Sequence, residues 1–248
     1  MFISDLHLSV QRPDISERFR QFIESRGQGA EAIYILGDLF EAWVGDDAIG
    51  KCERGVAESL GALTRRGTPV YFLHGNRDFL LGTEYCAAAG MRLIEQPTII
   101  DLYGVPTVLL HGDTLCTRDV SYQRYRARVT DPEWQQRMLA RPAWVRRGIA
   151  SMLRFASRVR NRSGDRPEMD VAPDAVEGLF RQSGVRRMIH GHTHKPDRHR
   201  HTVDGRDCER IVLGDWYEQG SVLTATRDGR LTLESLGDRS DQPGRRPG

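Results

Sequence analysis

The sequence has little cysteine and no long apolar run, and both shortages exclude whole classes of protein. Its four cysteines are irregularly spaced without a C-x-x-C pair, which argues against a disulfide framework and a zinc knuckle. No apolar stretch approaches the roughly 20 residues of a membrane-spanning helix, and no basic segment followed by an apolar stretch opens the chain. We therefore expect a cytosolic protein whose cysteines are reduced thiols that mostly serve as packing groups.

Net charge is also nearly absent, at +2, but the basic residues are unevenly distributed. Arginines are concentrated between residues 124 and 166 and again after residue 239, so we expect the middle of the chain to lie near an anion. Aromatic and basic residues do not alternate repeatedly, as they do in proteins that stack single-stranded bases. A nuclease and a nucleic-acid partner are therefore disfavoured.

The first half of the chain alternates between strand and helix patterns. Strand-like apolar runs at residues 32–36 and 70–74 are separated by helical spacing at residues 14–24 and 56–63. This order predicts a largely parallel sheet covered by helices. Residues 1–4 leave little chain before Asp5, which leaves open a natural start a few residues upstream.

The second half predicts a second sheet and a helical insertion, and hence an α/β protein of the α+β type built as a two-sheet sandwich. The expected strands are separated by short turns and cover residues 98–102, 106–111, 211–213, 222–226 and 231–236. Residues 119–170 lose the strand signals and place apolar residues at helical spacing, which predicts a cap inserted into a single domain of residues 1–237. Residues 238–248 have no apolar periodicity and are predicted to be a disordered tail.

Five short polar motifs each follow an apolar run. They are Asp5-x-His7, Gly37-Asp38, Gly75-Asn76-Arg77-Asp78, His111-Gly112-Asp113 and Gly191-His192-x-His194. If each run is a strand, the motifs converge at one sheet edge and supply seven metal donors: Asp5, His7, Asp38, Asn76, His111, His192 and His194. Each motif alone is weak, because a strand-end histidine usually only accepts or donates a hydrogen bond, but their conjunction favours a metal site.

Carboxylate, amide and imidazole donors without thiolate favour manganese, iron, magnesium or zinc. Two such ions about 3.5–4 Å apart can bridge a hydroxide and stabilise both the attacking and the leaving oxygen of a phosphoryl transfer. This chemistry suits hydrolysis of a phosphoester or a phosphoanhydride. One carboxylate must bridge the ions, and Asp38 is the candidate because Gly37 lets the backbone approach closely.

In this order the motifs resemble those of the calcineurin-like metallophosphoesterases. Within that superfamily the chain is similar, nearly end to end, to the UDP-2,3-diacylglucosamine pyrophosphohydrolase family of Gram-negative bacteria, which acts in lipid A biosynthesis. The resemblance rests on the runs at residues 3–8, 34–43, 74–80, 111–116 and 189–194. It implies hydrolysis of a nucleotide-linked glycolipid at the α-phosphate, releasing UMP and 2,3-diacylglucosamine 1-phosphate. It also implies peripheral contact with the cytoplasmic face of the inner membrane, and no obligate protein partner is evident.

The resemblance further assigns roles to individual residues. It implies that Asp5, His7, Asp38 and His194 hold one ion and that Asp38, Asn76, His111 and His192 hold the other, with manganese the usual metal. Asn76, Arg77 and His111 are the expected catalytic residues, and the inserted helices are expected to enclose the acyl chains. The expected substrate contacts are Asn76, Arg77, Asp119, Arg154, Ser157, Asn161 and His192. Many relatives have a lysine where this chain has Gly164, and whether Arg162 or Arg166 replaces it stays open.

Arg77 favours an anhydride substrate over an alkyl ester. Many phosphoesterases of the superfamily have a histidine at this position, which can protonate an alkoxide leaving group, whereas arginine donates no proton at physiological pH. Arginine can instead hold a phosphate through two hydrogen bonds, and a phosphate monoester with a second pKa of about 6 leaves without full protonation. The alternative is that Arg77 merely forms a salt bridge with Asp78.

Residues 143–162 combine an apolar stripe with a basic face. This pattern is typical of helices that bind anionic membrane surfaces or lipid head groups, but the stripe could equally pack against residues 134–139 with solvated arginines. The stripe is Val145, Ile149, Met152, Leu153 and Ala156, and the basic face is Arg146, Arg147, Arg154, Arg158, Arg160 and Arg162. For the whole chain two rivals remain, a soluble nucleotide pyrophosphatase or phosphodiesterase with the same metal centre, and a metal-bound scaffold without turnover.

Overall fold

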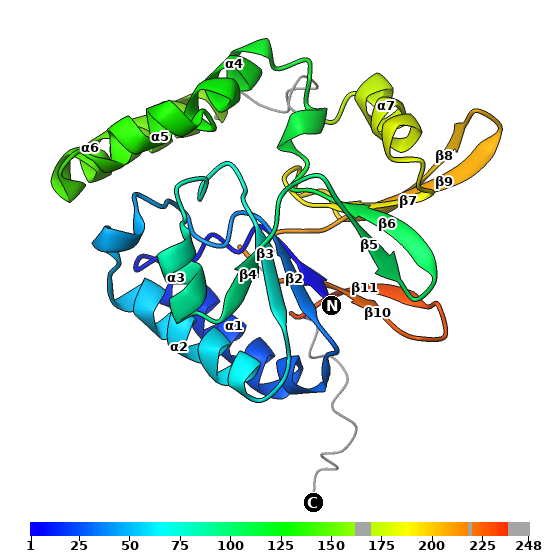
Figure 1. The fold of residues 1–248 in the computed structure, drawn as a ribbon, viewed down its shortest axis with the longest axis horizontal. Coiled ribbons are helices and arrows are strands. Elements are labelled where there is room, and N and C mark those ends of the chain that lie inside the picture. The colour runs from blue at the N-terminus through cyan, green and yellow to red at the C-terminus, as the bar shows by residue number, and fades with distance from the viewer. Residues whose placement is uncertain (162–169, 218–219, 238–248) are drawn as a thin grey trace, which may run out of the picture.

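The computed structural model describes residues 1–161, 170–217 and 220–237, and the side chains of residues 155–161 are not described. The sequence predictions for Arg162, Gly164, Arg166, the tail and the side chains of Ser157 and Asn161 therefore lie outside the described residues. Two mixed sheets pack face to face, with helices on the outer face of each (Figure 1). The predicted α/β two-sheet architecture is confirmed.

The first sheet has six strands in the order β11-β10-β1-β2-β3-β4. Strands β1 (Phe2–Ile3), β2 (Ile33–Leu36), β3 (Val70–Leu73) and β4 (Met91–Leu93) run parallel. They are connected by α1 (Pro13–Ser25), α2 (Lys51–Arg65) and α3 (Thr83–Ala88). The helices predicted at residues 14–24 and 56–63 are thus confirmed.

The second sheet has five strands in the order β5-β6-β7-β9-β8. Its centre is parallel and consists of β6 (Val105–Leu109), β7 (Arg187–His190) and β9 (Arg206–Val212). Antiparallel strands β5 (Thr98–Leu102) and β8 (Asp197–Val203) form its edges. Helix α7 (Pro173–Ser183) covers one face of this sheet, where Phe180 packs on Val108 and Met188.

The core follows from the two-residue period of the strands. In β2, Ile33 and Ile35 face the helices α1 and α2, whereas Leu36 faces the other sheet. In β6 and β7, Val108 and Met188 face α7, whereas Leu109 and Ile189 meet Leu36 and Leu73 between the sheets. Because the sheets are joined through this apolar layer, the ends of their strands are held at fixed relative positions.

One topological prediction is wrong. Strands β10 (Ser221–Ala225) and β11 (Leu231–Ser235) were expected in the second sheet, but β10 pairs with β1 and so extends the first. Strand β1 has only two residues, and its free edge is satisfied by a hairpin from the far end of the chain. The pattern of residues 222–236 marks a hairpin but carries no signal for the sheet that it joins.

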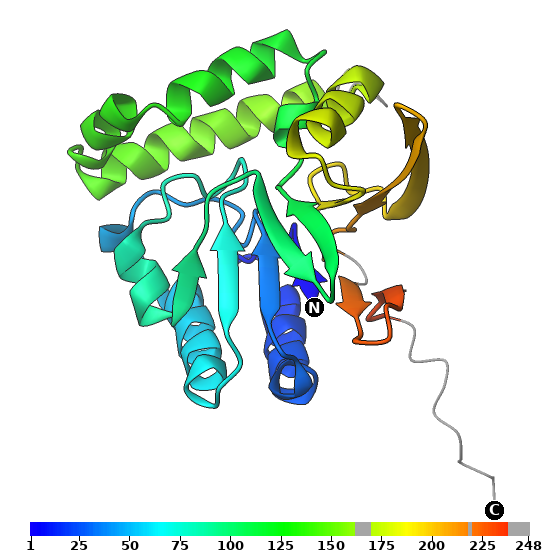
Figure 2. The same ribbon diagram turned by 45° about the vertical axis from the view of Figure 1, so that its right-hand side comes forward.

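Three helices form a layer beyond the carboxyl ends of β1, β2 and β3 (Figures 1 and 2). They are α4 (Val120–Val129), α5 (Pro132–Leu139) and α6 (Ala143–Asn161), which we call the helical layer. Asp119 and Asp131 cap α4 and α5 by accepting hydrogen bonds from Tyr122 N and Trp134 N. No helix among the described residues is both long and apolar enough to cross a membrane.

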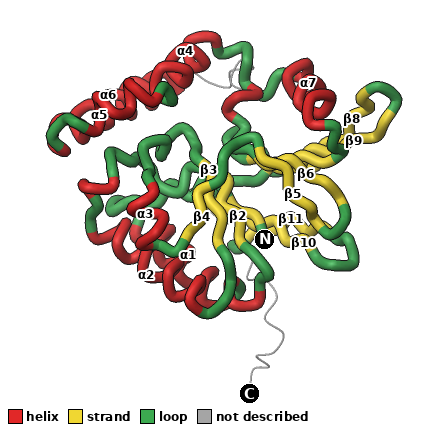
Figure 3. Tube along the Cα trace, in the orientation of Figure 1, coloured by secondary structure: helices red, strands yellow, loops and turns green. Residues whose placement is uncertain are grey.

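Figure 3 shows loops gathered between the strand ends and the helical layer, whereas the helices α1 and α2 lie against the outer face of the first sheet. The five polar motifs lie at or beside these loops, since each follows β1, β2, β3, β6 or β7. The fold therefore brings the motifs of both sheets toward one region.

Candidate metal centre

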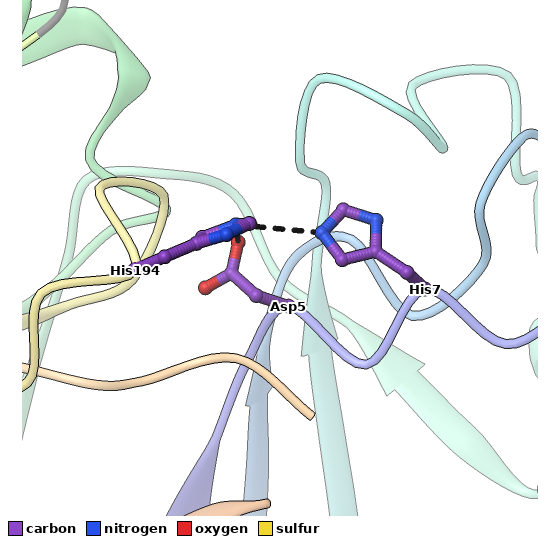
Figure 4. A group of neighbouring side chains, drawn as sticks. All are labelled: Asp5, His7 and His194. Atoms are coloured by element: carbon purple, nitrogen blue, oxygen red, sulfur yellow. Dashed lines mark hydrogen bonds and ion pairs between the residues drawn. The ribbon is translucent and has the colours of Figure 1, made fainter. Parts of the chain in front are cut away.

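The first group of donors comes from the loops after β1 and β7. Asp5 Oδ1 lies 3.3 Å from His194 Nε2, and His7 Nε2 lies 3.4 Å from His194 Nε2 (Figure 4). One nitrogen or oxygen from each of these three side chains lies within 4.8 Å of the others. Asp5 is fully buried and His7 nearly so, whereas His194 is partly open.

The second group adds donors from the loops after β2, β3, β6 and β7. Asn76 Oδ1 lies 3.0 Å from His111 Nε2 and 2.9 Å from His192 Nδ1. Asp38 lies between the two groups, because its Oδ1 is 3.8 Å from His111 Nε2 and its Oδ2 is 3.9 Å from His7 Nε2. The structure therefore brings all seven predicted donors into one cluster, with Asp38 facing both halves.

The cluster is held by strained backbone. Asp5, His7, Asp38, His192 and His194 all have positive φ, between 51° and 71°. Residues other than glycine rarely adopt this left-handed region, and each such residue costs on the order of 1 kcal/mol or more. The described residues show positive φ at only two further non-glycine positions, Tyr103 and Asp204. Concentration of this strain in the donors indicates that their positions are imposed by the surrounding fold.

Two glycines permit the close approach of the motif loops. A Cβ on Gly37 would lie 2.6 Å from His111 Nδ1 and 2.7 Å from the Gly75 Cα, and Gly37 itself has a φ of 86°. A Cβ on Gly75 would clash with the Asp38 carboxylate and amide. The glycine in each of these motifs is therefore required by space, in agreement with the role inferred for Gly37 from the sequence.

A second ring of acceptors orients the imidazoles, and the sequence analysis missed most of it. His111 Nδ1 donates to Leu36 O at 2.9 Å and His194 Nδ1 lies 3.1 Å from Asp215 Oδ2, so Nε2 of each ring faces the cluster. Glu41 Oε2 lies 3.5 Å from His7 Nδ1, which is buried and has no hydrogen-bond partner. The ring of Tyr217 also stacks on His7, with centroids 4.9 Å apart. No motif marks Asp215 or Tyr217, which follow β9 far along the chain.

We predict that Asp215→Ala weakens binding of a divalent cation by about 10–100-fold, because outer carboxylates orient ligating histidines and increase their basicity. Asp215→Asn should have a smaller effect, since an amide oxygen can still accept from His194 Nδ1. Competition with a fluorescent chelator measures the affinity directly. Equal metal affinity for the wild-type and alanine proteins would show that Asp215 does not orient His194.

Burial and the neighbouring charges shift the pKa values of the cluster's carboxylates and imidazoles in both directions. Burial, with the nearby charges of Asp78 and Asp5, raises the pKa of Asp38 to about 7. Burial also lowers the pKa of His7 to about 3 and that of His192 to about 4. For His194, burial is outweighed by Asp5 and Asp215, which raise its pKa to about 10. For Asp5, burial is outweighed by His194, His111 and His7, so its pKa falls below the usual range.

These residues fit divalent cations. Asp5 Oδ1 is buried, lies 3.3 Å from His194 Nε2 and has no hydrogen-bond partner, and a carboxylate oxygen in this position is better satisfied by a divalent cation. Two groups place oxygen and imidazole donors within 4.8 Å of one another, namely Asp5 with His7 and His194, and Asp5 with Asp38 and His111. The donor set of oxygens and imidazoles without thiolate suits manganese, iron, magnesium or zinc.

Arg77 lies beside the cluster and is not paired with Asp78. Asp78 is fully buried, and its two oxygens accept from Gly75 N and Leu39 N, both at 2.7 Å. The Arg77 backbone donates to Asp38 Oδ1 at 2.8 Å, whereas its buried Nε has no hydrogen-bond partner. The salt bridge considered from the sequence is therefore not formed, and the guanidinium is available to an anion in the adjoining cavity.

A cavity of ≈ 570 Å³ lies between the donor cluster and the helical layer. At one end it is lined by His7, Asp38, Asn76, Arg77 and His192, and at the other by Trp134, Met138, Ile149 and Leu153. Two predicted substrate contacts, Asp119 and Arg154, also line it. The cavity therefore joins a polar end that contains Arg77 to an apolar end.

The helical layer is tied to the body by ion pairs that the sequence did not predict, and each pair has one buried partner, Asp113 or Arg146. Asp113 Oδ2 accepts from Tyr122 Oη at 2.5 Å and from Arg126 Nε at 2.6 Å. Arg146 is buried and forms a bidentate ion pair with Asp47. The predicted basic face of α6 is therefore wrong at Arg146, because this arginine points inward, whereas Met152 of the predicted apolar stripe is exposed.

Comparison with known proteins gives consistent matches. The family model described as "Calcineurin-like phosphoesterase" matches residues 1–196. A protein of Xanthomonas campestris pv. campestris named "UDP-2,3-diacylglucosamine hydrolase" is 49% identical over 243 residues, which cover 95% of this chain and 98% of the relative. A protein of Stenotrophomonas maltophilia with the same name is 50% identical with the same coverage.

Proposed function

Since the chain belongs to the calcineurin-like phosphoesterase family, we propose that it hydrolyses the pyrophosphate bond of UDP-2,3-diacylglucosamine in lipid A biosynthesis. Its relatives carry the name of this hydrolase at 49–50% identity over nearly their whole length. The observation that carries the proposal is the cavity, which joins an arginine and a cluster of metal donors to an apolar end. A nucleotide-linked glycolipid has matching parts, with a diphosphate between polar and acyl groups.

Two divalent cations would be held by the seven donors, and we propose manganese for both. Asp5, His7, Asp38 and His194 would hold one ion, and Asp38, Asn76, His111 and His192 the other. When bound, such a pair supplies an activated water and stabilises the phosphoryl oxygens. Asp38 suits the shared position because its two oxygens face His111 and His7, respectively.

The side chains around the donors would then position the diphosphate. Water adds to the α-phosphorus, the bond from that phosphorus to the bridging oxygen breaks, and UMP and 2,3-diacylglucosamine 1-phosphate separate. The proton of the attacking water goes to solvent. Arg77 stabilises the charge that develops on the departing sugar phosphate, because its guanidinium enters the cavity and its Nε has no other partner.

Asp119 and Arg154 would contact the remaining parts of the substrate. Arg154 is partly buried and lines the cavity near Leu153, where a cation can pair with phosphate without leaving the apolar wall. Asp119 lines the cavity at the start of α4, and its carboxylate can accept from sugar or nucleoside hydroxyls. His192 and Asn76 also line the cavity, so both can contact substrate as well as a cation.

The experiment that tests this function compares the acylated substrate with UDP-N-acetylglucosamine in the presence of manganese. Each methylene buried in the apolar end contributes about 0.8 kcal/mol, so we expect kcat/KM to be at least about 100-fold higher for the acylated substrate. Hydrolysis in ¹⁸O-water should place the label in UMP, which mass spectrometry detects. Equal rates on both substrates would favour the soluble nucleotide pyrophosphatase, and label in the sugar phosphate would overturn the site of attack.

The location follows from the substrate. We propose that the protein works at the cytoplasmic face of the inner membrane, in peripheral contact with it, because a diacylated sugar nucleotide partitions into a bilayer.

A further inference from the structure

The chain crosses from the first sheet to the second between β4 and β5 (Figure 1), and Gln96 lies on this crossing. Strand β5 pairs antiparallel with β6, and the ladder ends with Thr98 opposite Leu109. Pro97 has no backbone N–H and cannot donate to a longer ladder. The side chain of Gln96 makes the next contact instead, because its Oε1 accepts from His111 N at 2.7 Å. Gln96 thus holds the backbone of a predicted metal donor.

The same side-chain amide also holds the loop after β3. Gln96 Nε2 donates to His74 O at 2.7 Å. On the other side of that peptide group, Gly75 N donates to Asp78 Oδ1 at 2.7 Å. The peptide group between His74 and Gly75 is therefore fixed at both its oxygen and its N–H. The next residue in the chain is Asn76, a second predicted donor.

The two contacts of Gln96 converge on one half of the donor cluster. Asn76 Oδ1 lies 3.0 Å from His111 Nε2, so a shift of either backbone would separate these donor atoms. A glutamine amide carries both an acceptor oxygen and N–H donors, and a single side chain can therefore fix both backbones. Gln96 does not line the substrate cavity. Its effect on the reaction must therefore pass through the metal donors.

The other half of the cluster is held by different contacts. Asp5 N donates to Gly37 O at 3.1 Å. His7 N donates to Asp38 O at 3.0 Å. These hydrogen bonds join the loops after β1 and β2 and do not depend on the Gln96 amide. Loss of that amide should therefore disturb the two halves of the cluster unequally.

We propose that Gln96 is a positioning residue for one of the two cations, which we call the second cation, namely the one assigned to Asp38, Asn76, His111 and His192. Its amide keeps two of these donors in register across the two sheets. The assignment of two cations rests on the proposed function. Gln96→Met keeps the length of the side chain but removes both hydrogen bonds. We expect it to weaken binding of the second cation by about 10–100-fold, as the loss of outer contacts does at other metal sites, and to leave the affinity for the first cation unchanged.

Metal binding tests the proposal without substrate. Calorimetric titration of the chelator-treated protein with manganese measures both affinities, and electron paramagnetic resonance distinguishes two ions coupled through a shared ligand from isolated ions. Gln96→Met should lack the coupled signal at a manganese concentration where the wild-type protein shows it. Excess manganese should restore both the signal and the turnover of the variant, which a general loss of fold would not allow.

The matched control is Gln135→Met in α5. Gln135 is also a partly buried glutamine that bridges two segments, since its Nε2 donates to Phe79 O and Val129 O. It does not line the cavity. The control variant should bind both cations like the wild-type protein.

The outcomes separate this proposal from the proposed function. Selective weakening of one cation in Gln96→Met supports the positioning role. Two cations bound as tightly as in the wild-type protein would overturn that role alone. Equal weakening of both cations would also overturn it, because Gln96 would then support the fold as a whole. A wild-type protein that binds a single cation would instead overturn the dinuclear centre of the proposed function, and this inference with it.

Discussion

Replacement of Asp38 with asparagine should lower kcat/KM for the glycolipid by at least about 10³-fold, which corresponds to about 4 kcal/mol in the activation barrier. Asp38 is the donor that faces both halves of the cluster, with its oxygens 3.8 Å from His111 Nε2 and 3.9 Å from His7 Nε2. Removal of its charge leaves four imidazoles around a single carboxylate, Asp5. A second cation is then no longer held. Steady-state kinetics and the metal content of the purified protein measure the two effects separately.

The fold should survive this substitution, so the loss is attributable to the site. Asparagine keeps an oxygen that can accept from the Arg77 backbone, as Asp38 Oδ1 does at 2.8 Å, and circular dichroism should be unchanged. The matched control is Asp228→Asn in the turn between β10 and β11, where the carboxylate is exposed, and it should retain normal turnover. Near-normal hydrolysis by the Asp38 variant, or by wild-type protein after exhaustive chelation, would contradict the dinuclear centre.

The second large effect is expected at Arg77. Arg77→Ala should lower kcat by about 10²–10³-fold, the range found when a preorganised donor to a developing negative charge is removed. KM should change less, because the charge on the leaving phosphate grows mainly in the transition state. Arg77→Lys should recover only part of the rate, since an ammonium group cannot form the two parallel hydrogen bonds of a guanidinium. Kinetics on the acylated substrate give kcat and KM separately.

The control for Arg77 is an arginine of similar type away from the cavity. Arg227 pairs with Glu31 at 2.7 Å on the surface, and Arg227→Ala should leave both kinetic constants unchanged. An unaltered kcat in Arg77→Ala would refute its role at the leaving group. A rise in KM alone would reduce Arg77 to a binding residue.

Local patterns predicted much of the fold because they record local constraints. The helical spacing of Ile15, Phe19 and Phe22 reflects the single face that α1 buries, so the helix is visible without its partners. Strand β8, by contrast, was not predicted, because its segment has no such local pattern. Its sequence is Asp-Arg-His-Arg-His-Thr-Val at the edge of a sheet, and an edge strand with one partner needs no apolar alternation. Likewise, the pairing of β10 with β1 joins residues over 200 positions apart, which no local pattern records.

In the candidate site, too, some residues could be predicted from local patterns and others could not. The donors could be predicted because each motif follows a strand, and parallel strands deliver their carboxyl ends to a common edge. Asp215, Glu41 and Tyr217 could not be predicted, because they contact the histidines only after the chain has folded. Arg146 was misplaced because its helical position suggests solvent, whereas the loop at Asp47 covers it.

By itself, the sequence determined which side chains can serve as metal donors and that they end strands, since chemical type and strand period are properties of short segments. Only the tertiary structure decided which sheet each hairpin joins and which acceptors orient the imidazoles. It also decided that Arg77 lines the cavity and does not pair with Asp78. These features depend on contacts between distant residues. Such contacts form through packing and hydrogen bonding in three dimensions, and the free energy that selects them is spread over the whole folded chain.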